Sequence, residues 1–105
     1  MKEFYHYTLE DKVKAIRNSG IFPNHPYFTT NQYFTSHEAG NALGIMPHNI
    51  DCVLLFADDG DFKYAGLVPL GHGGLLLGGG TQYQHPFRPK PIAKRKIFET
   101  TWTKL

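Results

Sequence analysis

Hydrophobic and polar residues follow a strand-like pattern at the start of the chain, where Glu3–Tyr7 mixes charged and aromatic positions. Thr8 is then a candidate helix N-cap. Val13 and Ile16 share one face of a helix of about three turns, for which Gly20 supplies a stop. This order predicts a short strand followed directly by a helix.

The middle of the chain holds the strongest strand pattern. Ile50–Ala57 is a continuous apolar run, too short for a typical core helix, that ends at an Asp-Asp-Gly turn. Before it, aromatic and β-branched residues predict a short strand over 26–30. A second short helix is expected to begin with Ser36 as its N-cap and to end near Gly44. We expect Ile50–Ala57 to be central in a sheet.

The second half of the chain combines short strand patterns with glycine. Strands are predicted at Leu67–Leu70, Gln82–His85 and Lys96–Thr103. Gly71–Gly80 contains six glycines, whose entropy cost on folding favours mobility unless a ligand or partner orders the segment. The whole pattern predicts one α+β domain over residues 1–105, with a mixed, mostly β core and two short helices near its N-terminus.

Composition narrows the class of protein. Hydrophobic residues at 41% and charged residues at 19% are typical of a globular domain. No apolar run approaches the roughly 20 residues needed to cross a bilayer, and the opening residues lack the apolar region of a signal peptide. A single cysteine, Cys52, excludes an internal disulfide and is expected to be buried in the central strand. Without close ligand pairs, no metal site is expected.

Charge is uneven along the chain. The formal net charge of +2 is too small to indicate nucleic-acid binding by itself. Five basic residues nevertheless fall within Arg88–Lys96. A solvated turn and edge strand is the favoured interpretation, and the alternatives are a docking face for an acidic protein or an RNA contact.

Three motifs carry the candidate chemistry: Tyr5-His6-Tyr7-Thr8, Tyr27-Phe28-Thr29 and Gly78-Gly79-Gly80-Thr81-Gln82-Tyr83. In this order they resemble the ADP-ribosyltransferase fold of the His-Tyr-Glu lineage. In that lineage the first-strand His binds NAD, an aromatic residue on the next strand stacks on nicotinamide, and a late-strand acidic or amide residue contacts the nicotinamide ribose. The resemblance implies a small ADP-ribosyltransferase-like split, mixed β-sheet.

The resemblance extends to bacterial polymorphic-toxin domains that open His-Tyr-Thr and continue into a helix ending Ser-Gly-Ile, here Ser19-Gly20-Ile21. The Gly-Gly-Gly-Thr-Gln-Tyr segment is similar to the late catalytic strand of the tuberculosis necrotizing toxin family of NAD glycohydrolases. These likenesses imply a monomeric NAD-consuming toxin domain, delivered into the target-cell cytoplasm as part of a larger secreted protein. They also imply a cognate immunity protein as partner.

By the same resemblance, Gln82 and His6 are the candidate catalytic residues. The expected NAD-binding residues are His6, Tyr7, Thr8, Tyr27, Thr29, Gly80 and Thr81. Cleavage of the nicotinamide–ribose bond passes through an oxocarbenium-like centre, so the enzyme must hold the leaving group and place a negative or dipolar group near the developing charge. Tyr27 can stack on the pyridinium, and the backbone beside Tyr7 can pair with the carboxamide.

Gln82 departs from the pattern, because transferases of this fold commonly use Glu at that position. An amide makes a weaker hydrogen bond than a carboxylate and cannot act as a base. ADP-ribosylation of a target-cell macromolecule and hydrolysis of NAD by water therefore both stay open, the first slightly ahead on the wider match. The triple glycine Gly78–Gly80 fits either a β-bulge or a close backbone approach to a ligand.

Other classes of function also stay open. As a lone residue, a histidine at a strand end such as His6 is most often an ordinary surface histidine. A ribonuclease would use His6 with His72 or His85 as acid and base, aided by Arg88–Lys96. A non-catalytic binding module would use Gly71–Gly80 and the basic stretch to engage a partner.

Overall fold

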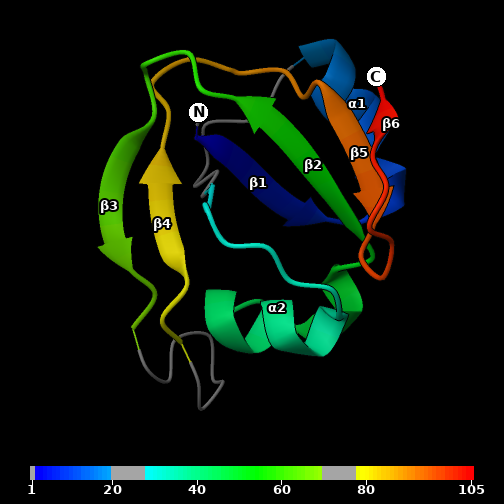
Figure 1. The fold of residues 1–105 in the computed structure, drawn as a ribbon, viewed down its shortest axis with the longest axis vertical. Helices are drawn as coiled ribbons and strands as arrows, with labels where there is room; N and C mark the ends of the chain where they lie inside the picture. Colours follow the sequence, from blue (N-terminus) through cyan, green and yellow to red (C-terminus); the bar gives the residue numbers. More distant parts are fainter. Residues whose placement is uncertain (1, 20–27, 70–77) are drawn as a thin grey trace.

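The computed structural model describes residues 2–19, 28–69 and 78–105 (Figure 1). The elements follow one another as β1 (Glu3–Thr8), η1 (Glu10–Lys12), α1 (Val13–Ser19), α2 (Ser36–Leu43), η2 (Pro47–Asn49), β2 (Cys52–Ala57), β3 (Lys63–Leu67), β4 (Thr81–Gln84), β5 (Ala93–Lys96) and β6 (Thr103–Lys104). Gly20, Tyr27 and His72 lie outside the described residues, as does most of the glycine-rich segment. The described residues form an α+β fold with two α-helices, as predicted.

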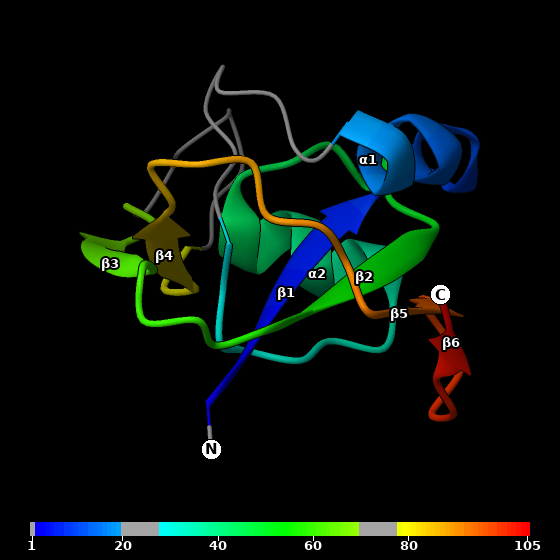
Figure 2. The ribbon, with the colours of Figure 1, turned by 90° about the horizontal axis from the view of Figure 1, so that it is seen from above.

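The strands form two separate antiparallel sheets. β1, β2, β5 and β6 make a four-stranded sheet in that order, and β3 pairs with β4 as a hairpin. The hairpin lies at one end of the molecule and β6 with the C-terminus at the other (Figure 2). β1 is therefore an edge strand of the larger sheet, and this edge faces the hairpin (Figure 1).

A two-residue segment, Phe28 and Thr29, joins the two sheets. Thr29 exchanges both backbone hydrogen bonds with Tyr5 of β1, at N···O distances of 2.8 and 3.0 Å. Phe28 exchanges both with Tyr83 of β4, at 2.9 and 2.7 Å. Neighbouring residues of an extended chain direct their N–H and C=O groups to opposite sides, so one short segment bonds in both directions.

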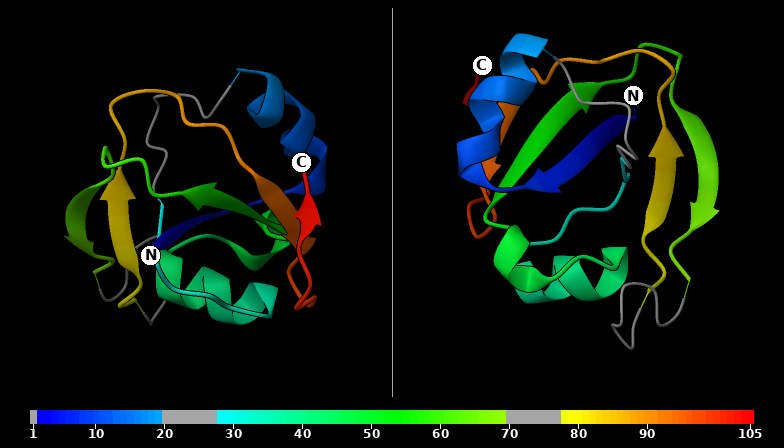
Figure 3. Two further views of the ribbon diagram at one scale, coloured as in Figure 1. Left: turned by 45° about the horizontal axis from the view of Figure 1, so that its top comes forward. Right: turned by 180° about the vertical axis from the view of Figure 1, so that it is seen from behind.

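The larger sheet is buried on both faces. Cys52, Leu54 and Phe56 of β2 pack with α1, whereas Val53 and Leu55 pack with α2. The two helices accordingly lie on opposite sides of the strands (Figure 3, left). This burial explains why β2 reads as a continuous apolar run, and it confirms β2 as a central strand.

The single cysteine behaves as predicted. Cys52 is fully buried, and burial raises the pKa of its thiol to about 12. Such a thiol is unreactive at neutral pH because the thiolate is the nucleophile. In the described ranges, no helix combines the length and apolar content that spanning a membrane requires.

The N-cap of each helical segment lies one residue from its predicted position. Thr8 completes β1 instead of capping a helix, and the helical segment begins with η1 after Leu9. The N-cap of α2 is Thr35, whose hydroxyl accepts the backbone N–H of Glu38 at 3.0 Å. Ser36 instead donates its hydroxyl to the carbonyl of Ile50. Gly44 ends α2 with a left-handed φ of 72°, as predicted.

Two strand predictions were wrong in position. β3 occupies Lys63–Leu67, before the predicted Leu67–Leu70, and most of its residues are exposed. Of the predicted strand Lys96–Thr103, only Lys96 and Thr103 belong to strands, as the end of β5 and the start of β6. A turn lies between them, and the Glu99 carboxylate accepts the backbone N–H of Lys96 at 2.9 Å. That local bond competes with continuation of the strand.

Within the basic stretch, Arg88, Lys90 and Lys96 are exposed as expected, but β5 is not an edge strand. β5 lies between β2 and β6, and Arg95 is 2% exposed. Its guanidinium donates to the carbonyls of Ile97, Glu99 and Tyr33 at 2.8, 3.0 and 3.0 Å. The guanidinium also contacts two aromatic rings: its central carbon lies 4.5 Å from the ring centroid of Phe34 and 5.0 Å from that of Trp102. Burial lowers the pKa of Arg95 from its ordinary value.

Candidate functional site

A pocket of about 180 Å³ opens where the two sheets meet. β1 contributes three consecutive residues, Tyr5–Tyr7, and the joining segment contributes Phe28 and Thr29. Thr81 and Gln82 come from the start of β4. The C-terminal end of α2 and Val68 add apolar surface, so the pocket draws on chain regions far apart in sequence.

The pocket runs along the free edge of β1. Side chains of consecutive strand residues point to opposite faces, yet Tyr5, His6 and Tyr7 all line it. Tyr5 and Tyr7 pack on the α2 side of the sheet, whereas Phe4, two residues from His6, packs on the α1 side. A pocket that touches both faces of one strand lies beyond that strand's backbone edge.

The backbone of Tyr7 faces this edge. Tyr5 directs its N–H and C=O away from β2, because both bond to Thr29. Tyr7, two residues further, directs its own pair to the same side. Among the described residues, none bonds to the backbone N–H or C=O of Tyr7 on that side. One donor and one acceptor are therefore available at the wall of the pocket.

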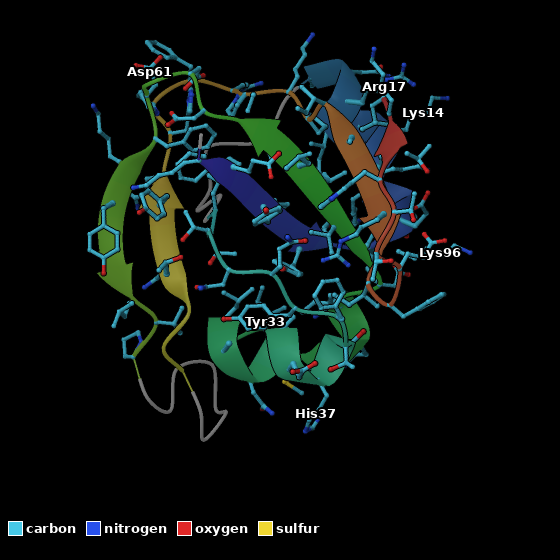
Figure 4. All side chains as sticks on the ribbon, in the orientation of Figure 1. Lys14, Arg17, Tyr33, His37, Asp61 and Lys96 are labelled. Atoms are coloured by element: carbon cyan, nitrogen blue, oxygen red, sulfur yellow. The ribbon has the colours of Figure 1, made fainter. Side chains whose placement is uncertain are left out.

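The side chain of Tyr7 has a different role from its backbone. Its buried hydroxyl donates to the carbonyl of Asn31 at 2.9 Å and accepts the N–H of Tyr33 at 2.8 Å. Burial raises the pKa of this phenol well above its ordinary value. Tyr33 is partly buried, packs against the core cluster that contains Tyr7 and lies beside α2 (Figure 4).

A polar network fixes the rim of the pocket where β4 begins. The hydroxyl of Thr81 lies 2.8 Å from that of Thr29 and accepts the N–H of Thr30 at 2.9 Å. The Asn31 carboxamide oxygen accepts the Thr81 N–H at 2.9 Å. Thr29 and Thr81 therefore use much of their hydrogen-bonding capacity within the protein, so their main effect on the pocket is to set its shape.

Gly80 is required by packing against α2. A β-carbon built on it meets the Leu43 Cδ2 at 2.6 Å and the Ala42 carbonyl oxygen at 3.0 Å. Its N–H donates to Ala42 and its carbonyl accepts the N–H of Val68. The close approach predicted for the triple glycine is thus to the protein's own helix. Gly79 has a φ of 93°, a conformation that favours glycine.

His6 and Gln82, the candidate catalytic residues, both line the pocket. His6 is half-buried, with its ring centroid 5.9 Å from that of Phe28. Gln82 is also half-buried, and no described residue hydrogen-bonds to its side-chain amide. The two residues come from different sheets, and the pocket brings them together.

Only some of the predicted NAD-binding residues lie at the pocket. Tyr7, Thr29 and Thr81 line the pocket together with the two candidate catalytic residues. Thr8 and Gly80 do not line it, and Tyr27 lies outside the described residues. Sequence reasoning missed Asn31, whose side chain organises the rim, because an asparagine after a strand usually indicates only a turn.

His85, proposed as a partner of His6 in a ribonuclease, is not among the residues that line the pocket. Its Nε2 lies 2.8 Å from the Asp59 carboxylate, and its Nδ1 accepts the N–H of Phe87 at 3.0 Å. A neutral ring with its proton on Nε2 satisfies both contacts. His72, the other proposed partner, lies outside the described residues.

Comparisons with known proteins give no family. No family model matches the chain, and neither the curated proteins nor the solved structures include a significant match.

Proposed function

We propose that this domain binds the nicotinamide of NAD at the free edge of β1 and cleaves the nicotinamide–ribose bond, with water as the acceptor. The observation that carries the proposal is the backbone N–H and C=O of Tyr7 at the wall of the pocket, for which no described residue supplies a partner on that side. A primary carboxamide has one acceptor oxygen and N–H donors, so it complements such a pair as a neighbouring strand would.

The size of the pocket supports one aromatic ring as its occupant. A cavity of about 150 Å³ is enough for benzene, whereas pockets for whole drug-sized ligands run from about 300 Å³. At about 180 Å³, this pocket suits a ring with a small substituent. The apolar surface from Phe28, Leu43, Ile45 and Val68 is appropriate to a planar heteroaromatic group. The ribose and the rest of NAD would then extend outside.

The polar residues at the site have separate roles in this proposal. His6 lines the pocket from β1, and its proposed role is to bond a ribose hydroxyl. The Gln82 amide is placed at the start of β4 to orient its dipole toward the positive charge that develops on the ribose. Neither role requires a side chain that changes its protonation state.

The choice of acceptor follows from the charge of the pocket. None of its described lining residues is Asp or Glu, and neither acid occurs within 20–27 or 70–77. Activation of a protein or nucleic-acid acceptor benefits from a general base near the reacting carbon. Water is abundant and small enough to reach the reacting carbon in a pocket of this size, so hydrolysis fits better than transfer.

A domain that depletes NAD is harmful in any cell that lacks an inhibitor. We therefore extend the proposal to the toxin role and the immunity protein that the sequence resemblance implies. The mouth of the pocket is the natural target of such an inhibitor, since covering it excludes NAD.

The test is incubation of the purified chain with NAD labelled in its adenylate half, with and without a cell lysate. Free ADP-ribose without lysate is the expected product. Label that appears on a macromolecule, and only in the tube with lysate, would show that the reaction is transfer and not hydrolysis. Intact NAD in both tubes would overturn the proposal.

Matched variants locate the chemistry. We expect Gln82→Ala to lower kcat about 10²-fold, since a preorganised dipole near the developing charge is removed. Gln84→Ala is the control, because Gln84 is an exposed residue of the same strand.

His6→Ala is expected to raise KM, and His37→Ala is its control, because His37 is exposed on the outer side of α2 (Figure 4). Equal losses in a variant and its control would place the reaction elsewhere.

A further inference from the structure

A second cluster of polar side chains lies at the other end of β4 from Thr81. Asp59 and Asp61 belong to the loop between β2 and β3, and His85 directly follows β4. One ligand atom from each lies within 4.8 Å of the other two. Asp61 marks this loop at the top of the molecule, whereas the pocket adjoins α2 below it (Figure 4).

The imidazole is held in place by its surroundings. The His85 side chain is 2% exposed, and its ring packs against that of Phe62 at a centroid distance of 4.7 Å. Its Nε2 faces the Asp59 carboxylate, which is 46% exposed. The histidine is therefore fixed, while the carboxylate beside it is open to ions from solvent.

Phe87 supplies Nδ1 with two alternative partners. The N–H of Phe87 lies 3.0 Å from Nδ1 and is donated to it, and the Phe87 carbonyl oxygen lies 3.2 Å away. With the proton on Nε2, the ring donates to Asp59 and accepts from Phe87. With the proton on Nδ1, the ring would donate to the Phe87 carbonyl, give up the hydrogen bond from the Phe87 N–H and present a lone pair on Nε2 to the two aspartates. Metal-binding histidines characteristically use this second arrangement.

We propose that His85 Nε2 and the carboxylates of Asp59 and Asp61 bind a divalent transition-metal ion, with Zn²⁺ as its representative. On binding, the His85 proton moves from Nε2 to Nδ1, and the ring stays neutral. The bound ion joins the loop that leaves the four-stranded sheet to the strand end of the hairpin. It stabilises the junction of the sheets and takes no part in the chemistry of the pocket.

The donor set selects the kind of ion. An imidazole nitrogen with two carboxylate oxygens suits Zn²⁺, whereas Ca²⁺ and Mg²⁺ prefer sets made of oxygen alone. Bonds of about 2.1 Å at tetrahedral angles place two ligand atoms about 3.4 Å apart. Closure from separations of up to 4.8 Å therefore requires each ligand atom to shift by about 0.7 Å.

The test is titration of the untagged chain with Zn²⁺ in the absence of NAD, followed by calorimetry and by ¹⁵N spectra of the histidine rings. We expect binding of one ion and an exchange of the protonated and unprotonated nitrogens of His85. The unfolding midpoint should rise by about 10 °C when free Zn²⁺ exceeds Kd a hundredfold. No binding, or binding with the His85 nitrogens unchanged, would overturn the proposal.

Two neighbouring carboxylates provide the matched variants. Asp61→Asn removes a proposed ligand without touching the His85–Asp59 contact, and it should weaken Zn²⁺ binding at least tenfold. Asp58→Asn makes the same charge change beside the site and keeps an oxygen for the Gly60 N–H, so it should bind as the wild type does. Equal weakening in both variants would show only general attraction to an acidic loop and would overturn the assignment. NAD cleavage is read separately, so either proposal can fail alone.

Discussion

Arg95 and the edge of β1 both place strong hydrogen-bonding groups inside the domain, but they use them in opposite ways. The Arg95 guanidinium donates to backbone carbonyls from two chain segments and lies between two aromatic rings. The backbone pair of Tyr7 and the amide of Gln82 have no such partners among the described residues, and they adjoin a pocket. At Arg95 the buried Nε has no partner among the described residues, but the two terminal nitrogens are satisfied inside the protein, which indicates a structural role. Hydrogen-bonding groups left beside a cavity instead favour a ligand.

The comparison is tested most strongly at Arg95. We expect Arg95→Met to lower the free energy of unfolding by about 3 kcal/mol, because several buried carbonyls lose their donor. Lys96→Met, at the exposed neighbouring position, should change it by less than about 0.5 kcal/mol. Urea denaturation of both variants measures the difference. A mild loss at Arg95, with NAD cleavage abolished, would reverse its assignment as structural.

Gly80 tests whether the helix contact shapes the pocket. Gly80→Ala should cost about 2 kcal/mol, because its methyl group collides with Leu43, a pocket residue. Gly60→Ala has open space but a φ of 87°, so strain alone should cost about 1 kcal/mol. Denaturation gives the stabilities and NAD titration gives the affinities. We expect only Gly80→Ala to weaken NAD binding. Equal weakening in both variants would show that the packing of Gly80 against α2 does not determine the affinity for NAD.

The side chain and the backbone of Tyr7 are expected to have separate roles, the first in stability and the second in NAD binding. Tyr7→Phe removes the hydroxyl that bonds Asn31 and Tyr33, so it should cost about 1.5 kcal/mol of stability. The backbone pair remains, so NAD cleavage per folded molecule should stay within about twofold of the wild type. Thermal unfolding and single-temperature kinetics check the two statements. A collapse of activity in a folded variant would show that the phenol itself meets the ligand.

The smallest effect is expected from the exposed pair of Glu10 and Lys94. Their hydrogen bond lowers the pKa of Glu10 below its ordinary value. The pair therefore stabilises the fold above the unfolded pKa of Glu10, and this contribution is lost as the pH falls through the lower folded value. We expect Glu10→Gln to cost at most about 0.5 kcal/mol at pH 7 and nothing below about pH 3. Unfolding midpoints between pH 7 and pH 3 measure this, and a larger loss at low pH would contradict it.

The sequence predicted those parts of the fold that depend on local or strongly apolar patterns. β2 was recognisable because its apolar side chains alternate between two buried faces, and Gly44 ended α2 because a left-handed turn favours glycine. β3 was missed because its side chains are mostly exposed and show no alternation. Arg95 was assigned to the surface because its partners come from 32–34 and 97–102, which no local pattern connects to β5.

The site was predictable in its residue types more than in its geometry. His6, Tyr7 and Gln82 were selected by motif, and they do line one pocket. The role of the Tyr7 backbone depends on which side of β1 is an edge, and only strand order supplies that. The hydrogen bond between Asp59 and His85 depends on a contact between the ends of two sheets, and no spacing in the sequence predicts that contact.

The Phe28–Thr29 segment gives the domain an unusual folding requirement. Its bonds to Tyr5 and Tyr83 tie the beginning of the chain to its last third through a dipeptide that belongs to neither sheet. A nascent chain that has formed β1, β2 and both helices still lacks the β4 wall. The pocket wall that β4 supplies is therefore complete only when β4 has docked, and a chain that ends before β4 lacks Thr81 and Gln82.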